Sequence, residues 1–298
     1  MVNVFSGDGF SLEAMTAAIN KLPNKYNRLA SVFTEEPITT TSVAVDQLDG
    51  TLNIVETKPR NAPADVVKQD KRSLRSFAIP HIPLSGVLRP EDVQNVRAFG
   101  SESQLETQAA VLMRKVGRMK DSLDQTREYL RMGALKGVVS DADASSSTIV
   151  DLYKEFGIEK KTVNFALDDE DTEVIEKCLD VADHIESHLR GESMTGIRVL
   201  VDLAFYKALT THPKVRDAFR AYMVASQNLA GDYRRGFEFG GIVFETYPAV
   251  WTDKGGTSHK AIATGYGHAF PEGTGDTFKE IIAPGNFMQA VNTVGMPY

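Results

Sequence analysis

The amino-acid sequence predicts an α+β fold. Residues 101–136 read as one long helix with an apolar stripe, whereas residues 41–85 and 138–153 read as short strands joined by turns. The chain shows no regular succession of strand and helix of the kind that builds a parallel sheet. These observations favour separate helices and hairpins over a doubly wound architecture.

The long helix is predicted from apolar or small residues at alternating steps of four and three, which keep to one helix face. They are Leu105, Ala109, Leu112, Val116, Met119, Leu123, Thr126, Leu130 and Gly133. Ser103 and Glu106 are spaced as a capping box, and Gly137 is placed to end the helix. About thirty residues would span about 45 Å. Such a rod is half of a coiled coil, a strut against which a sheet packs, or an ordinary long helix in a globular enzyme.

Composition narrows the class of protein. The chain has 298 residues and a net charge of −7, which argues against a general nucleic-acid binder. The single cysteine, Cys178, excludes an internal disulfide and favours a reducing compartment. We expect no signal peptide at the N-terminus, and no apolar stretch is long enough to cross a bilayer.

Residues 1–40 are expected to form an arm with little core, containing a short helix over residues 11–22. The arm would lie either on its own fold or on a neighbouring subunit. Next, Val43 and Val45 alternate in a strand, Asp49-Gly50 is a hairpin signal, and residues 52–54 would return.

A loop of about fifteen residues then precedes a strand at residues 73–79. Residues 56–76 hold six basic and three acidic side chains. The loop is either a solvated flap or a projection docked on an acidic neighbour. The candidate subunit-contact residues are Lys58, Arg60, Lys68, Lys71, Arg72 and Arg75.

The remaining elements are predicted from periodicity and turn residues. A helix is expected over residues 89–99, a hairpin over 138–153, a helix over 168–191 that buries Cys178, and a strand over 197–201. Helices follow over 203–211 and from Pro213, then a strand over 237–247, a turn at 253–256, a returning segment over 260–264, a glycine-rich loop over 265–275, a strand over 278–282 and a helical turn over 286–292.

Several catalytic patterns are incomplete. Asp141 and Asp143, with Asp168, suggest a metal-dependent phosphatase-like hydrolase, but that chemistry needs a doubly wound sheet. His184 and His188 have the spacing of the two histidines of a zinc protease, but the residue directly after the first histidine is Ile185 and not the required glutamate. We predict no catalytic residue, cofactor or metal site; the hydrolase and a non-viral scaffold that dimerises through the long helix remain the alternatives.

Three stretches together resemble the major capsid proteins of lambda-like tailed phages, the capsid protein E family. They are Phe77–Leu84 (FAIPHIPL) running on to Glu91–Gly100 (EDVQNVRAFG), Phe237–Tyr247 (FEFGGIVFETY), and Ala283–Gly295 (APGNFMQAVNTVG). The similarity runs in order from about residue 40 to the C-terminus. That family is similar to the Hong Kong 97-type capsid fold.

The resemblance implies an N-terminal arm at residues 1–40, a β-hairpin with an extended loop at 41–85, a peripheral domain at 86–160 with its spine helix at 101–136, and an axial domain at 161–298. Family members usually continue past the motif ending at Gly295 and return to the peripheral domain. Here Met296-Pro297-Tyr298 follows, so this return is expected to be shortened or absent.

The resemblance also implies a function. Copies of the chain would assemble as pentamers and hexamers into the icosahedral head of a tailed phage, enclosing double-stranded DNA without reading its sequence. Scaffold, portal and decoration proteins would be partners, and a membrane would not. The protein would reside in the virion, and in the host cytoplasm during assembly.

Overall fold

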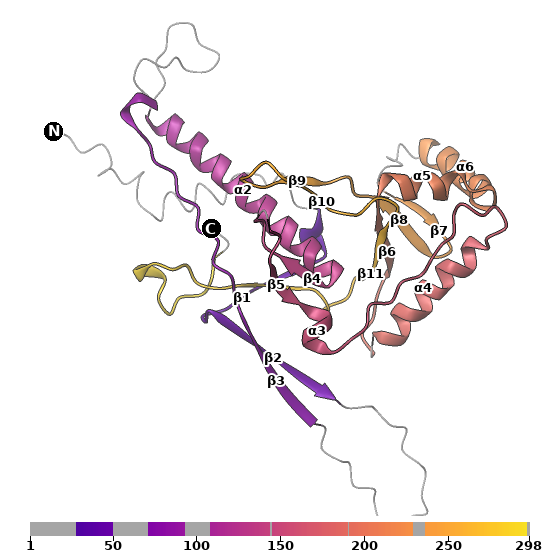
Figure 1. The fold of residues 1–298 in the computed structure, drawn as a ribbon, viewed down its shortest axis with the longest axis horizontal. Coiled ribbons are helices and arrows are strands. Elements are labelled where there is room, and N and C mark those ends of the chain that lie inside the picture. The colour runs from indigo at the N-terminus through magenta and orange to yellow at the C-terminus, as the bar shows by residue number, and fades with distance from the viewer. Residues whose placement is uncertain are drawn as a thin grey trace, which may run out of the picture. The chain divides into compact units, whose positions relative to one another are not determined.

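The computed structural model describes residues 28–49, 71–92, 108–143, 145–189, 191–228 and 236–296 (Figure 1). The chain divides into two compact units. The first comprises Met1–Thr34, Leu84–Glu280 and Tyr298, and the second comprises Glu35–Pro83 and Ile281–Pro297. The predicted helix at residues 11–22 and the returning strand at 52–54 lie outside the described residues.

The predicted long helix is confirmed as α2 (Gln108–Lys136), while residues 101–107 lie outside the described part. It ends at Gly137, whose φ of +84° lies in the left-handed region. A Cβ there would meet the Tyr153 ring at 2.4 Å, so only glycine fits. The Tyr153 hydroxyl also donates to the Lys136 carbonyl oxygen at 3.0 Å and closes the helix end.

The predicted hairpin after α2 is confirmed as β4 (Val138–Ser140) and β5 (Thr148–Asp151). The second strand is shorter than predicted because α3 (Leu152–Phe156) begins at once. Asp151 caps that helix by accepting a hydrogen bond from the Lys154 N–H. The helix predicted over residues 89–99 begins as a 3₁₀ turn, η4 (Pro90–Asp92), and its remainder lies outside the described residues.

The apolar stripe from which α2 was predicted is not the most buried face of the helix. Leu112, Leu123 and Leu130 are only half-buried, and Ala109 is exposed. The helix instead buries a mainly charged row, comprising Val111, Lys120, Asp124, Glu128, Arg131 and Met132. Glu128 and Arg131 have polar partners on facing elements that make their burial tolerable, and periodicity alone does not reveal such partners. Oδ2 of Asp124, by contrast, is buried without a hydrogen-bond partner among the described residues.

A four-stranded sheet lies at the centre of the first unit, in the order β11-β6-β8-β7. The strands are β6 (Gly196–Val201), β7 (Phe237–Phe239), β8 (Ile242–Thr246) and β11 (Gly267–Glu272). Only β6 and β8 are parallel. The predicted glycine-rich loop at residues 265–275 is therefore wrong over β11, where Gly267 lets the strand approach Val201 closely.

The segment predicted as one strand over residues 237–247 is a hairpin of β7 and β8. Gly240 and Gly241 form its turn, with φ of +60° and +77°. Two consecutive positive φ values are the signature of a type I′ hairpin turn. The two glycines therefore reverse the chain.

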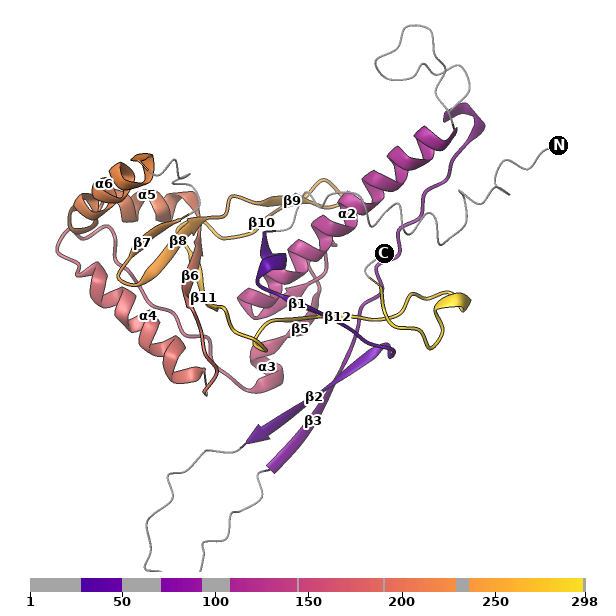
Figure 2. The same ribbon diagram turned by 180° about the vertical axis from the view of Figure 1, so that it is seen from behind.

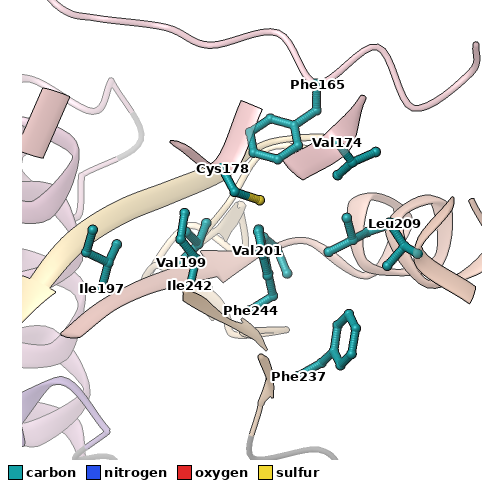
Figure 3. Packing of buried hydrophobic residues seen from close by; sticks show 11 residues of the cluster. Phe165, Val174, Cys178, Ile197, Val199, Val201, Leu209, Phe237, Ile242 and Phe244 are labelled. Atoms are coloured by element: carbon teal, nitrogen blue, oxygen red, sulfur yellow. The ribbon is translucent and has the colours of Figure 1, made fainter. Parts of the chain in front are cut away.

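Three helices cover the apolar face of this sheet. They are α4 (Val174–His188), α5 (Leu203–Thr211) and α6 (Pro213–Asn228). Figure 3 shows buried side chains of the core that forms there. Cys178 is fully buried among them, as predicted, and burial raises the pKa of its thiol to about 12. The helix predicted from residue 168 begins only at Val174, because the Asp169 carboxylate accepts from the Asp171 N–H and holds a turn.

The opposite face of the sheet belongs to a second core. It contains Leu200, Phe270 and Trp251 together with Met132 of α2. The predicted turn at residues 253–256 joins β9 (Val250–Thr252) to β10 (Ser258–Lys260), so the returning strand comes earlier than predicted. Leu29 of η3 (Leu29–Ser31) is fully buried here, so the prediction of little core in residues 1–40 is wrong at this point.

The second unit contains a two-stranded antiparallel ribbon of β2 (Ser42–Asp49) and β3 (Lys71–Ala78). Strands β1 (Thr34–Pro37) and β12 (Lys279–Ile282) also pair, and β12 is labelled in Figure 2. The predicted turn near the C-terminus is η6 (Met288–Ala290). The Gly295 N–H then donates to the Ile38 carbonyl oxygen at 2.9 Å, so the C-terminal segment is fixed within this unit.

Candidate functional site

A buried carboxylate on α2 binds the chain at Leu29, near the start of the described residues. Oε1 of Glu128, which is 3% exposed, accepts hydrogen bonds from the Leu29 N–H and the Tyr247 hydroxyl, both at 2.9 Å. Burial, followed by the charge of Glu128 and its hydrogen bond, raises the pKa of Tyr247, so this hydroxyl remains a donor. Glu128 thus joins three distant parts of the chain.

Two arginines of α2 bind a carboxylate of β12. Arg127 contacts both oxygens of Glu280 at 2.8 and 3.0 Å, and Arg131 binds Oε2 at 2.6 and 3.0 Å. Burial raises the pKa of Glu280, but the hydrogen bonds and charges of the two arginines outweigh it and leave this pKa below its ordinary value. Bidentate arginine–carboxylate pairs of this kind are among the strongest hydrogen-bonded ion pairs in proteins.

A second row of charges crosses the sheet on its less apolar face. Arg28 binds both oxygens of Glu245 at 2.7 and 2.5 Å, and Arg198 bridges Glu245 at 2.7 Å to Glu272 at 2.5 Å. The hydrogen bond to Glu245 is the main cause that raises the pKa of Arg28. The N-terminal segment is thus tied to the sheet by charge as well as by Leu29.

These clusters hold one subunit together. Sequence reasoning missed them because it followed apolar residues along α2. The signal lay on a neighbouring row of the helix, where the charged residues Lys120, Asp124, Glu128 and Arg131 recur at helical spacing and include both signs.

The β2–β3 ribbon differs from these clusters because it lacks a core. No side chain from Ser42 to Val45 or from Leu74 to Ala78 is buried, and Leu74 is 67% exposed. On the less exposed face of the ribbon, Val45 pairs with Arg75 and Val43 pairs with Phe77. An isolated two-stranded ribbon is at best marginally stable in water, so further contacts are needed to hold it.

Only part of the predicted basic contact set can be placed. Lys58, Arg60 and Lys68 lie outside the described residues. Lys71 and Arg72 lie in β3 opposite Asp49 and Leu48, and only their backbone is described. Arg75 is half-buried within the ribbon. Lys71, Arg72 and Arg75 therefore all lie on one strand, β3.

Of the three residues of the hydrolase alternative, Asp141 and Asp143 have structural uses, whereas Asp168 is exposed ahead of α4. The Asp143 carboxylate accepts hydrogen bonds from the hydroxyls of Ser145 and Ser147 within the β4–β5 turn. The Asp141 carboxylate accepts from the adjacent Ala142 N–H. The sheet also lacks the doubly wound parallel order that this chemistry requires, as far as the described residues go.

The rings of His184 and His188 on α4 lie close together, with centroids 4.3 Å apart and planes inclined by 45°. Burial, then the charges of His188 and Lys161, lower the pKa of His184. Across the described ranges, no group of three or more His, Cys, Asp or Glu side chains has an arrangement that would hold a metal ion. Across the same ranges, no helix is long and apolar enough to cross a membrane.

A small hollow of about 50 Å³ lies beside α2. Tyr129, Trp251 and His259 line it, and His259 Nε2 lies 3.3 Å from the Asp253 carboxylate. The volume is about that of one or two water molecules, which is far below the size of an ordinary ligand pocket. The exposed ribbon is therefore the better candidate for a functional surface.

Comparison with known proteins gives consistent matches. The model of the family described as phage major capsid protein E matches residues 11–298. The major capsid protein of Salmonella phage Felix O1 is 32% identical over 289 residues, covering 88% of this chain and 78% of that protein. The major capsid protein of Pseudomonas phage KPP10 is 28% identical over 308 residues, covering 97% and 86%.

A solved structure shares the fold. A crystal structure of a protein assigned as the capsid protein of a prophage of E. coli CFT073 matches with a TM-score of 0.50 and 16% sequence identity. The match covers 93% of this chain and 83% of that chain. At this identity the likeness speaks for the fold alone, and it fits the mixture of helices and sheet described above.

Proposed function

Because this chain belongs to the phage major capsid protein E family, we propose that many copies of it assemble into the icosahedral head of a tailed phage. By family and by its relatives the chain is a major capsid protein, a structural protein of the phage virion. The head would enclose double-stranded DNA without reading its sequence. A net charge of −7 suits a container, since a basic wall would retain DNA through counterion release.

The observation that carries this proposal is the β2–β3 ribbon. None of its described side chains between Ser42–Val45 and Leu74–Ala78 is buried, although strands normally bury one face. A neighbouring copy would supply the missing surface. The basic loop residues named above, with Arg75 at their end, would then contact that neighbour.

The Hong Kong 97-type arrangement gives each region a role. Residues 1–40 would be the arm, 41–85 the extended loop, 86–160 the peripheral domain with α2 as its spine, and 161–298 the axial domain. The likeness to the prophage protein supports this assignment at the level of the fold. Pentamers and hexamers would close the shell, together with scaffold, portal and decoration proteins, in the host cytoplasm.

The decisive experiment is to purify the chain and examine it by sedimentation and negative-stain microscopy. Shells, rings or capsomers are expected. Deleting residues 58–70 should leave a subunit with an unchanged circular-dichroism spectrum and melting temperature that no longer closes shells. Normal heads from that deletion would contradict the role of the loop, and a chain that stays monomeric under all conditions would contradict the assembly itself.

A further inference from the structure

We propose that the outer face of α4 binds the outer face of α5 and α6 on a second copy of this chain, head to tail. This proposal rests on the assembly proposed above and deepens it by naming one contact surface and its partner. The two surfaces lie on the same unit and carry opposite charge around exposed aliphatic side chains.

The α4 surface is called here the acidic face. Its exposed residues lie along one side of the helix and are Ile175, Glu176, Leu179, Asp180, Asp183 and Glu186. The two aliphatic side chains are one turn apart and are 48% and 57% exposed. Within the described residues, none of the four carboxylates has an ion pair with a lysine or arginine. Lys177 lies outside this row and is half-buried.

The α5–α6 surface is called here the basic face. Its exposed residues are Leu203 and Lys207 of α5, and Arg216, Arg220 and Val224 of α6. The three α6 residues follow one another at steps of four, so they form one row. Leu203 is 50% and Val224 61% exposed. Arg220 lies 3.8 Å from Asp217, but both side chains are largely exposed, so this pair is weak.

The acidic face and the basic face lie on different helices that pack on the same sheet. All three helices pack on the same apolar face of the sheet, around Val174, Val215 and Phe237. Figures 1 and 2 both show α4 apart from the α5–α6 pair. Within one copy the start of α4 does meet α6, because Nζ of Lys214 lies 2.6 Å from the Glu173 carboxylate. Within the described residues, however, none of the four carboxylates of the acidic face pairs with Arg216 or Arg220 of the same copy. A contact between unlike faces of identical copies is heterologous, and it closes into a ring when the rotation allows.

A second copy fits these faces better than another partner does. Apolar side chains ringed by charge match the ordinary anatomy of an interface, with an apolar centre and a polar rim. Opposite charges would fix the orientation of the copies, while each exposed pair alone contributes little. Repetition around a ring would then add many weak contacts. Nucleic acid, by contrast, would be repelled by the acidic face.

Charge reversal tests this contact in the full-length chain. Variant A carries Glu176→Lys and Asp180→Lys, variant B carries Arg216→Glu and Arg220→Glu, and variant AB carries all four changes. The fraction of chains in shells or capsomers is measured by sedimentation, at low and at high salt. Variants A and B should each assemble about tenfold less than the unmodified chain, and AB should recover most of that loss.

Matched controls separate the contact from general effects of charge. Glu155→Lys with Glu159→Lys changes the charge as much as variant A does, at exposed positions outside both faces, and should assemble normally. Melting temperatures of all variants should stay close to that of the unmodified chain, because every altered side chain is exposed. Ile175→Ser with Leu179→Ser should reduce assembly without unfolding the subunit.

The outcomes are distinguishable. If the unmodified chain assembles and A and B assemble equally well, this contact is refuted while the proposed function stands. If A and B both fail and AB stays as defective as either, the two faces do not meet and the proposal is overturned. Shells of variant B that form normally but hold less DNA would assign the basic face to nucleic acid instead. A chain that never assembles refutes the proposed function itself.

Discussion

The sheet of the first unit and the ribbon of the second use strands in opposite ways. Phe237, Ile242 and Phe244 of the sheet are fully buried beneath three helices. The described ribbon positions have no buried side chain on either face. The sheet therefore supports itself, whereas the ribbon needs surface from outside its own two strands. Under the proposed function, the sheet folds one subunit and the ribbon would contact a neighbouring one.

The strongest test of this contrast is Phe244→Ala. Phe244 is fully buried and lies edge-on to Phe165, so its truncation leaves a cavity and should cost about 3–5 kcal/mol of unfolding free energy. Chemical denaturation of the subunit measures this loss. Phe287→Ala, at a side chain that is 52% exposed in the second unit, is the matched control and should cost far less. Equal losses would abolish the contrast.

Glu128→Ala should destabilise the subunit by about 3 kcal/mol, because it leaves the Leu29 N–H and the Tyr247 hydroxyl buried without their acceptor. Glu128→Gln keeps an acceptor oxygen and should lose less. Protease resistance near residue 29 gives a second readout, since the N-terminal segment should detach first. An unchanged cleavage rate in the alanine variant would show that Leu29 is held by packing alone.

Acidification should weaken the first unit through Glu280. Arg127 and Arg131 hold the pKa of Glu280 below its ordinary value of 4.5, so its stabilising contribution is complete above that value and disappears as the pH falls through the folded-state pKa. Unfolding free energy measured across this range should fall less steeply in Glu280→Gln. The same slope in both proteins would mean that the ion pair does not favour the folded state.

The smallest effect on subunit stability is expected for Leu74→Ser. Leu74 is 67% exposed on the ribbon, so the unfolding free energy should change by less than about 0.5 kcal/mol. Assembly should nevertheless fall, since a neighbouring copy would cover this side chain. Sedimentation of the variant measures that fall. A large drop in melting temperature would instead place Leu74 against a core within its own subunit.

Much of the secondary structure followed from local signals. Periodicity and Gly137 predicted α2, and Pro213 marked the first residue of α6. Turn chemistry was harder, because Gly240-Gly241 looks the same inside a strand as in the type I′ turn that it forms. β11 was missed because its pairing partner, β6, lies about seventy residues earlier in the chain.

The buried charges of α2 could not be assigned from sequence for a different reason. Whether Glu128 faces water or the core depends on Leu29 and Tyr247, which reach it from separate parts of the chain. Likewise, the exposed ribbon reads as an ordinary hairpin until its lack of a buried face is seen. The family resemblance predicted the arm and loop that composition alone left undecided.

The tie between Arg28 and Glu245 has a consequence for how the protein is made. The two residues are 217 positions apart, and Leu29 waits for Glu128 as well. At about 5–20 residues per second, the ribosome needs about 10–40 seconds to deliver Glu245 after Arg28. Until then Arg28 lacks its carboxylate partner, so the contacts of residues 28–29 are completed only when translation is nearly finished.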